Sequence, residues 1–148
     1  MGLESILMRR SIVAVLLVAT ATLSGACASE AGGDITGKTW HLTSVTTVAP
    51  NFATVVPAEA MANYTISFDP GGTFAAKADC NQVSGTYTIT GKSVLTIKPG
   101  PSTLAACPDG SLSDKYVATL AQASSYTTTS NQLTITLLDN GTLSFQAG

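Results

Sequence analysis

Strict alternation of apolar side chains with Thr or Ser along short segments is the feature that most constrains the fold of this chain. In Tyr64–Phe68 every second residue is apolar, and the same pattern returns several times further along. A period of two places one set of side chains in a core and the other in water, which is typical of half-buried strands. The expected strands are 40–42, 64–68, 87–89, 95–97, 133–137 and 143–145.

Turn residues separate these segments at short intervals. Asp69-Pro70-Gly71-Gly72 leads into an expected strand at 73–77, Thr90-Gly91-Lys92 joins the next pair, and Asn140-Gly141 is a two-residue hairpin signal. Gly and Asn adopt the positive φ angles that tight hairpins require. Short hairpins between consecutive strands predict an antiparallel meander.

Two segments depart from the period of two. Four residues recur at helical spacing: Leu112, Tyr116, Leu120 and Ala123. Ser111 with Asp114 three residues later resembles a capping box, so we expect one amphipathic helix of about three turns. The segment Val45–Ala62, with Pro50 and Pro57, shows no clear period and is predicted to be a loop over one mouth of the fold.

These elements predict a fold dominated by β-structure. Seven or eight strands and one helix within residues 35–148 favour a small antiparallel barrel, curled or partly closed, with the helix packed on it. A β-sandwich is the alternative.

The N-terminus reads as an export signal. Arg9-Arg10 precedes an uncharged, largely apolar run, residues 11–23, that is shorter than the roughly 20 residues needed to span a bilayer. Leu23-Ser24-Gly25-Ala26 before Cys27 resembles the lipobox of bacterial lipoproteins. We therefore expect a signal peptide at 1–26, a lipidated Cys27 with a flexible tether at 27–34, and a domain at 35–148. The protein would be exported and anchored by lipid on the extracytoplasmic face of the cell envelope.

Three points about export stay open. An ordinary signal peptide could be cut after Ala26 or Ala28, because small residues flank Cys27 on both sides. Arg9-Arg10-Ser11-Ile12-Val13 is also a partial match to the twin-arginine export signal, an alternative to the general route. Glu4 before the basic residues suggests that translation begins at Met8 instead of Met1.

The low content of charged residues and the net negative charge argue against binding to nucleic acid or to anionic lipid. Only 11% of the residues are charged, and after removal of 1–26 five Lys oppose eight Asp and Glu, a net charge of −3. No basic stripe is present to bind phosphates, so we expect no nucleic acid partner. Nothing basic helps attach the protein to anionic lipid, so membrane attachment would depend on acyl chains. With one His and no clustered ligands, we expect no metal and no cofactor.

The cysteines suggest a disulfide. If Cys27 is acylated, Cys80 and Cys107 remain as an even pair in an oxidising compartment. A bridge between them would stabilise the fold by about 3 to 4 kcal/mol. A redox site is not expected, because a close Cys-x-x-Cys pair is missing.

The residues around these cysteines carry a family resemblance. Gly37-Lys-Thr-Trp40 opens the domain, Cys80-Asn81-x-x-x-Gly85-x-Tyr87 lies in its middle, and Ser102-Thr103 precedes Ala-Cys107-Pro108. In this order they resemble the META domain family, which includes the heat-shock-associated HslJ proteins and many bacterial lipoproteins. The similarity covers about Ile35 to Gln146. Asp79 departs from the family, which commonly has Gly before this Cys, so the local backbone is expected to differ there.

The resemblance implies a lipocalin-like barrel with a helix against it and no established reaction. It associates the family with stress tolerance, novobiocin resistance and secretion, and structurally with pilot lipoproteins that hold lipid. Those associations do not transfer automatically. The family residues here are candidates for a structural latch or a binding site: Trp40, Asn81, Gly85, Tyr87, Ser102 and Thr103. Trp40 is expected in the core, and Gly85 is expected where backbones approach closely.

Catalysis is not predicted. His41 is the sole imidazole, no nucleophile elbow is present, and the acidic residues are scattered singly. The leading hypothesis is a non-catalytic envelope lipoprotein that binds an envelope protein or serves under stress. The alternative is a carrier of lipid or a small apolar ligand in the barrel interior, and a purely structural accessory domain is a third possibility. A filled interior, which we expect, would argue against the carrier.

Overall fold

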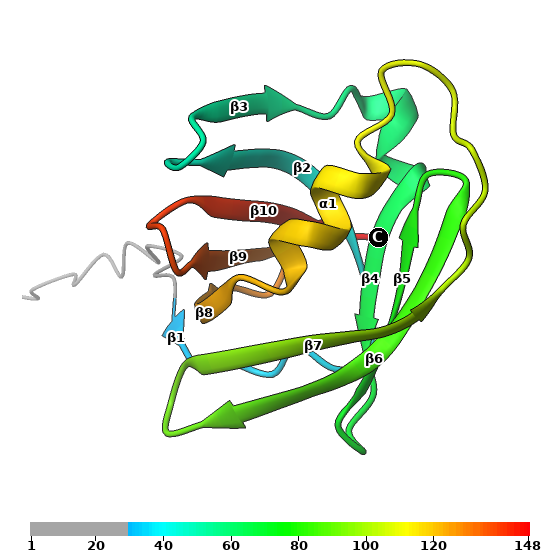
Figure 1. Cartoon of the computed structure of the whole chain (residues 1–148). Coiled ribbons are helices and arrows are strands. Elements are labelled where there is room, and N and C mark those ends of the chain that lie inside the picture. The colour runs from blue at the N-terminus through cyan, green and yellow to red at the C-terminus, as the bar shows by residue number, and fades with distance from the viewer. Residues whose placement is uncertain (1–29) are drawn as a thin grey trace, which may run out of the picture.

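A computed structural model of the chain describes residues 30–148, and the predictions on the signal peptide, Cys27 and the translation start lie outside them. Ten strands, one 3-10 helix and one α-helix make up the described part (Figure 1). Their bounds are β1 Glu30–Ala31, β2 Thr39–Thr47, β3 Phe52–Val55, η1 Ala58–Asn63, β4 Tyr64–Phe68, β5 Thr73–Ala78, β6 Asn81–Thr90, β7 Val94–Ser102, α1 Ser113–Leu120, β8 Ala123–Thr128, β9 Gln132–Leu137 and β10 Thr142–Ala147.

Eight of these strands close into an antiparallel barrel, in the order β8-β7-β6-β5-β4-β2-β10-β9 and back to β8. The prediction of a small antiparallel barrel with one helix is confirmed. β3 pairs with β2 outside the ring, and β1 pairs with β8. The junction of β7 with β8 is narrow, because Val94↔Ser125 is its single residue pair.

Large side chains fill the barrel. Trp40 and Tyr116 are fully buried, and the ring of Tyr116 lies 6.3 Å from that of Phe145, centroid to centroid. The indole N–H of Trp40 donates to the carbonyl oxygen of Ile35 at 2.9 Å, which satisfies its polar group as a buried tryptophan requires. All the side chains predicted to point inward are buried except Ile89, which is 38% exposed near the end of β6.

The helix is shorter than predicted. α1 has eight residues, about two turns, and it buries Ser113, Tyr116, Thr119 and Leu120. Ala123, which the helical spacing had included, begins β8. The expected capping box is absent: Leu112 is the N-cap and makes no side-chain cap bond, while the Ser111 hydroxyl accepts from the Ser113 N–H.

The prediction of a loop over Val45–Ala62 was wrong for much of the segment. β2 continues to Thr47, β3 pairs back along it, and η1 follows. The alternation is not recognisable at the end of β2 because Thr47, a polar residue, occupies an inward position and is only 9% exposed. Its hydroxyl donates to the carbonyl of Pro50 at 2.6 Å.

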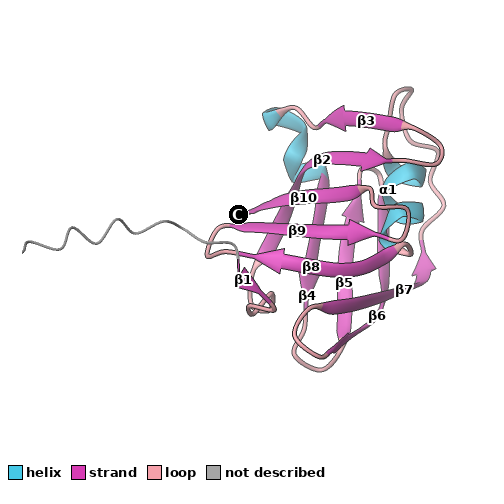
Figure 2. Ribbon diagram, turned by 90° about the vertical axis from the view of Figure 1, so that its left-hand side faces the viewer, coloured by secondary structure: helices cyan, strands magenta, loops and turns pink. Residues whose placement is uncertain are grey.

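Two ends of the barrel can be told apart (Figure 2). The α1 end carries α1, the β5–β6 turn, the β7–α1 loop and the β9–β10 turn, since Asn81 bonds to Ser113 and Leu138 bonds to Gln122. The β1 end carries β1, the β8–β9 turn and the C-terminus, since Lys38 reaches the carbonyl of Ser130. Figure 2 places α1 on one side, with β1 and the C-terminus toward the other.

The start of the described chain is docked on the barrel. Glu30 and Ala31 pair with Thr128 and Thr127 of β8, so these two residues of the predicted tether 27–34 lie in a strand. They use the same edge of β8 that β7 contacts at Ser125. The carbonyl of Gly33 then accepts from the Tyr126 hydroxyl at 3.0 Å.

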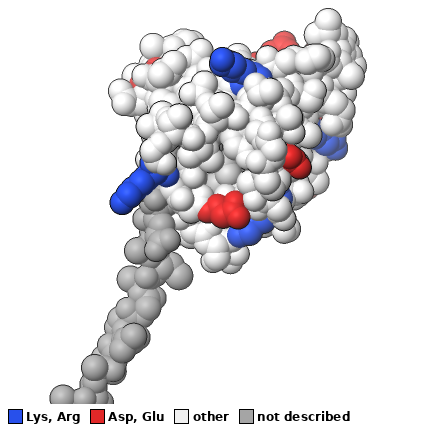
Figure 3. Space-filling model, turned by 90° about the horizontal axis from the view of Figure 1, so that it is seen from below, with Lys and Arg blue, Asp and Glu red and all other residues white. Residues whose placement is uncertain are grey.

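The surface is sparsely charged. Figure 3 shows one face on which Lys, Arg, Asp and Glu are scattered between uncharged residues. No helix within residues 30–148 is long and apolar enough to cross a membrane.

Candidate functional site

The predicted disulfide between Cys80 and Cys107 is confirmed. Their Cα atoms lie 5.5 Å apart, and the bond ties the β5–β6 turn to the loop that connects β7 with α1. We call residues 103–112 the stapled loop. Most of it is exposed to solvent, so covalent attachment holds an otherwise weakly packed segment in place.

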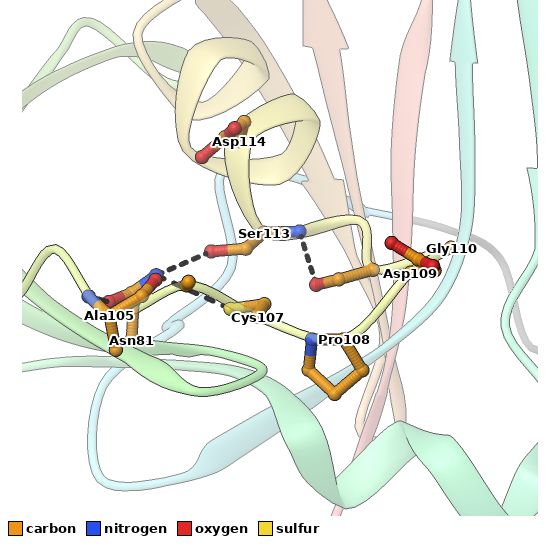
Figure 4. Close-up of a pocket in the computed structure, with 10 residues that line it drawn as sticks. Asn81, Ala105, Cys107, Pro108, Asp109, Gly110, Ser113 and Asp114 are labelled. Carbon is orange, nitrogen blue, oxygen red and sulfur yellow. Dashed lines mark hydrogen bonds between the residues drawn. The ribbon is translucent and has the colours of Figure 1, made fainter.

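The side chain of Asn81, the first residue of β6, holds the stapled loop by hydrogen bonds, and we call this set of bonds the latch (Figure 4). Its side-chain oxygen accepts from the Ala105 N–H at 2.8 Å and from the Thr103 hydroxyl at 3.0 Å. Its amide nitrogen donates to the Ser113 hydroxyl at 3.1 Å and to the Ala105 carbonyl at 3.2 Å, and Cys107 Sγ is 3.4 Å away. With only 6% of its surface exposed and its hydrogen-bonding capacity used, Asn81 has nothing left to offer a ligand.

The neighbours of Asn81 complete the latch. Thr103 accepts from the backbone N–H of Gln82 at 2.9 Å, whereas the exposed Ser102 hydroxyl bonds only to the carbonyl of Thr103. Asp79 has a φ of 58°, the left-handed conformation that glycine adopts at little cost. The aspartate therefore takes a glycine-like backbone conformation beside Cys80.

The other candidates lie away from this cluster. Trp40 is in the core, and Tyr87 packs edge-on against Phe68 at 4.9 Å and donates to the Asp69 carbonyl. A Cβ on Gly85 would collide with the carbonyl oxygen of Lys98, so this glycine allows β7 to approach β6 at a register shift. The structure thus brings Asn81, Thr103 and Cys107 together, but not Trp40, Gly85 or Tyr87.

Two open hollows flank α1 on the outer surface. One, of about 450 Å³, lies between the stapled loop and α1 and is lined by Leu104, Val117 and Ala118 among others. The other, of about 250 Å³, lies between α1 and the residues that follow β2, and Ala118 and Lys115 line it. Because Ala118 is exposed and lines both, the outer face of α1 separates two neighbouring depressions.

Exposed apolar side chains gather around these hollows. Leu104 is 94% exposed, Leu138 68% and Val48 60%. All three belong to the α1 end, since Val48 and Leu138 adjoin Asp139 in neighbouring turns. Sequence reasoning missed them, because isolated apolar residues outside a period carry no signal of where they lie in space.

Asp139 fixes one of those turns. Its carboxylate accepts from the N–H groups of Gly141 at 2.8 Å, Val48 at 2.7 Å and Ala49 at 3.2 Å. These backbone hydrogen bonds hold the pKa of Asp139 below its usual value, and the bond from the Gly141 N–H has the largest effect.

A further hollow, of about 380 Å³, has a polar lining that includes Asp109 and Asp114. Among the residues described, no group of three or more His, Cys, Asp or Glu side chains is placed to hold a metal ion. His41 is half-buried on β2, where its backbone pairs with Thr65 and Gln146. In the described part of the chain, every buried side-chain nitrogen and oxygen has a hydrogen-bond partner.

Comparison with known families identifies the chain. The model for the META domain matches residues 33–148, which include every strand and helix described here except β1. The chain belongs to the META domain family. Nothing in that description names a reaction, and no curated protein matches this chain.

Solved structures share the fold of this META domain. A protein from Burkholderia xenovorans, solved by NMR, is 16% identical and superposes with a TM-score of 0.62, covering 86% of this chain and 97% of its own. A DUF4847 family protein from Bacteroides vulgatus is 18% identical with a TM-score of 0.54, covering 76% and 93%. At these identities the likeness establishes the fold alone.

Proposed function

We propose that this protein is a lipid-anchored, extracytoplasmic META domain protein that binds a protein partner of the cell envelope through its α1 end and catalyses no reaction. One observation carries the proposal: the barrel interior is filled, while apolar side chains stand exposed around α1. A stress-related role remains an expectation from the family resemblance.

The anchor is supported by the sequence and by the disulfide. The apolar run 11–23 and the small residues before Cys27 fit a lipoprotein signal. The Cys80–Cys107 disulfide, in which Cys80 is exposed, supports export because such bonds persist in oxidising compartments outside the cytoplasm. Acyl chains would then attach a domain whose own surface carries few charges.

The partner surface is supported by the chemistry of the α1 end. We define this surface as the outer side of α1 with Leu104, Val48 and Leu138 around it. Exposed apolar residues beside hollows favour protein contacts, in which aliphatic side chains of a partner fill the depressions. Asp114 and Lys115 on α1 add one charge of each sign for orientation.

The filled interior argues against the carrier alternative. A small-molecule site usually needs about 300 Å³ or more of concave space. Trp40, Tyr116 and Phe145 occupy the barrel centre, and none of them lines the hollows described above.

Site-specific photo-crosslinking in the native bacterium tests the partner surface. A photoreactive residue replaces Leu104 in the full-length chain, and a matched one replaces Asn131 at the β1 end; both positions are exposed. We expect one discrete protein adduct from position 104 that is absent from position 131. Ala118→Arg should abolish it, because a long charged side chain at the boundary of the two hollows would keep an apolar partner away, while Thr88→Arg on the exposed side of β6 should not.

The anchor is tested in the same strains. Metabolic labelling with a fatty acid should mark the wild type and not Cys27→Ala, and only the wild type should stay with membranes. An adduct that survives Ala118→Arg would refute the partner surface, and an unlabelled wild type would refute the anchor.

A further inference from the structure

We propose that the β1 end of the barrel faces the lipid bilayer, so that the α1 end points away from the membrane. This inference rests on the proposed anchoring at Cys27 and adds to it an orientation. The β1 end is formed by β1, residues 34–38, the β4–β5 and β8–β9 turns and the C-terminus.

The chain that leads from the anchor is fixed to this end. Glu30 and Ala31 pair with β8, and the Gly33 carbonyl accepts the Tyr126 hydroxyl. Gly32, with a φ of 85°, passes so close to Lys92 that a Cβ would collide with its carbonyl oxygen, and a Cβ on Gly33 would lie 2.6 Å from the Thr128 methyl. The two glycines therefore make the docking possible.

This docking makes the connection to the bilayer short. Cys27 precedes Glu30 by three residues, which span at most about 10 Å when extended. Without the docking, the first fixed residue would be the buried Ile35, and eight residues would span about 28 Å. The six residues of β8 make the barrel wall about 20 Å long between its ends. A connection longer than this wall would allow either end to reach the bilayer, whereas the shorter connection keeps the β1 end nearer to the lipid.

The surface at the β1 end suits contact with lipid headgroups. The charged residues of this end are three acidic ones, Glu30, Asp34 and Asp69, and two basic ones, Lys38 and the Lys92 of the adjoining β6–β7 turn. Its β8–β9 turn is polar. The most exposed apolar side chains, those of Leu104, Val55 and Leu138, lie elsewhere. This face would rest at the headgroups without inserting, and the acyl chains would supply the attachment.

Depth-dependent fluorescence quenching tests the orientation. Full-length protein, acylated in its bacterial host, is reconstituted into phosphatidylethanolamine–phosphatidylglycerol vesicles that carry a headgroup nitroxide. A thiol-reactive fluorophore is placed on Asn131→Cys or on Leu104→Cys, with the native disulfide left oxidised. We expect the probe at 131 to lose most of its emission and the probe at 104 to lose little.

Gly32→Val tests the cause of the orientation. The added side chain should release β1 and make quenching at the two positions similar. Thr127→Val is the matched control, because it changes an exposed side chain in the same strand pair while keeping the backbone bonds. Thermal melts followed by circular dichroism verify that each variant is folded.

The outcomes separate the two proposals. Equal quenching at 131 and 104 in vesicle-bound protein with native β1, or stronger quenching at 104, would overturn the orientation alone. If Gly32→Val releases β1 and leaves the difference unchanged, docking of β1 is overturned as the cause of the orientation. Failure of the wild type to associate with vesicles would overturn the anchor and this inference with it.

Discussion

Replacing Asn81 by Ala should weaken the domain by an amount that its contacts allow us to work out. Two of the lost partners, Thr103 and the carbonyl of Ala105, lie in exposed residues where water takes the place of the amide. The Ser113 hydroxyl belongs to a residue only 4% exposed, and the Ala105 N–H loses the shortest of the bonds, 2.8 Å. At about 1 kcal/mol for each of these two, Asn81→Ala should cost about 2 kcal/mol.

Urea unfolding of the oxidised protein measures this loss in a Cys27→Ala background, which avoids the proposed acylation. In thermal melts of the same proteins, Tm should fall by roughly 8 °C. Gln82→Ala is the matched control, since its side chain is exposed and adjacent, and it should change stability by less than about 0.5 kcal/mol. A double-mutant cycle with Ser113→Ala should give a coupling of about 1 kcal/mol. A loss for Asn81→Ala no larger than that for Gln82→Ala would refute the latch.

Other perturbations have defined outcomes. Cys80→Ser with Cys107→Ser should lower the free energy of unfolding by about 3.5 kcal/mol, since the disulfide closes a 27-residue separation; urea curves unchanged by the substitutions would contradict this. Complete burial raises the pKa of Tyr116, so the unfolded chain loses this proton first and stability should fall above about pH 10; Tyr116→Phe should reduce that fall in pH-dependent melts. The lowered pKa of Asp139 stabilises the fold above its unfolded pKa, near 3.8, and the gain is lost as pH falls through the folded pKa; Asp139→Asn should therefore flatten the acid part of the stability curve, and an unchanged curve would contradict the turn's role.

The strands that sequence predicts best are those whose two faces differ most. Tyr64–Phe68 was predicted with its observed bounds, and 133–137 lies within β9, because burial alternates along both. Ile89 shares the inward face of β6 but stays partly exposed, since it lies one residue from the end of the strand. Alternation identifies the face of a residue, and its position along the barrel decides how far it is covered.

The parts that sequence missed depend on contacts between distant residues. Ala123 continues the helical spacing, yet β8 begins there, where Ala123 pairs with Leu137. β1 is too short to show a period and exists only because β8 offers a free edge. The disulfide could be inferred by counting cysteines, whereas the bond between Asn81 and Ser113 joins residues 32 positions apart and leaves no local pattern.

The narrow junction between β7 and β8 has a mechanical consequence. Val94↔Ser125 and the bond from Tyr126 N–H to the Ser93 carbonyl are the backbone contacts described there, and β1 occupies the next stretch of the same edge. If Cys27 is anchored and a partner is held at the α1 end, as proposed above, a pull between them would load β1 before any other strand. Two residue pairs would yield at small force, so β1 could detach and lengthen the connection while the strands of the barrel ring remained paired.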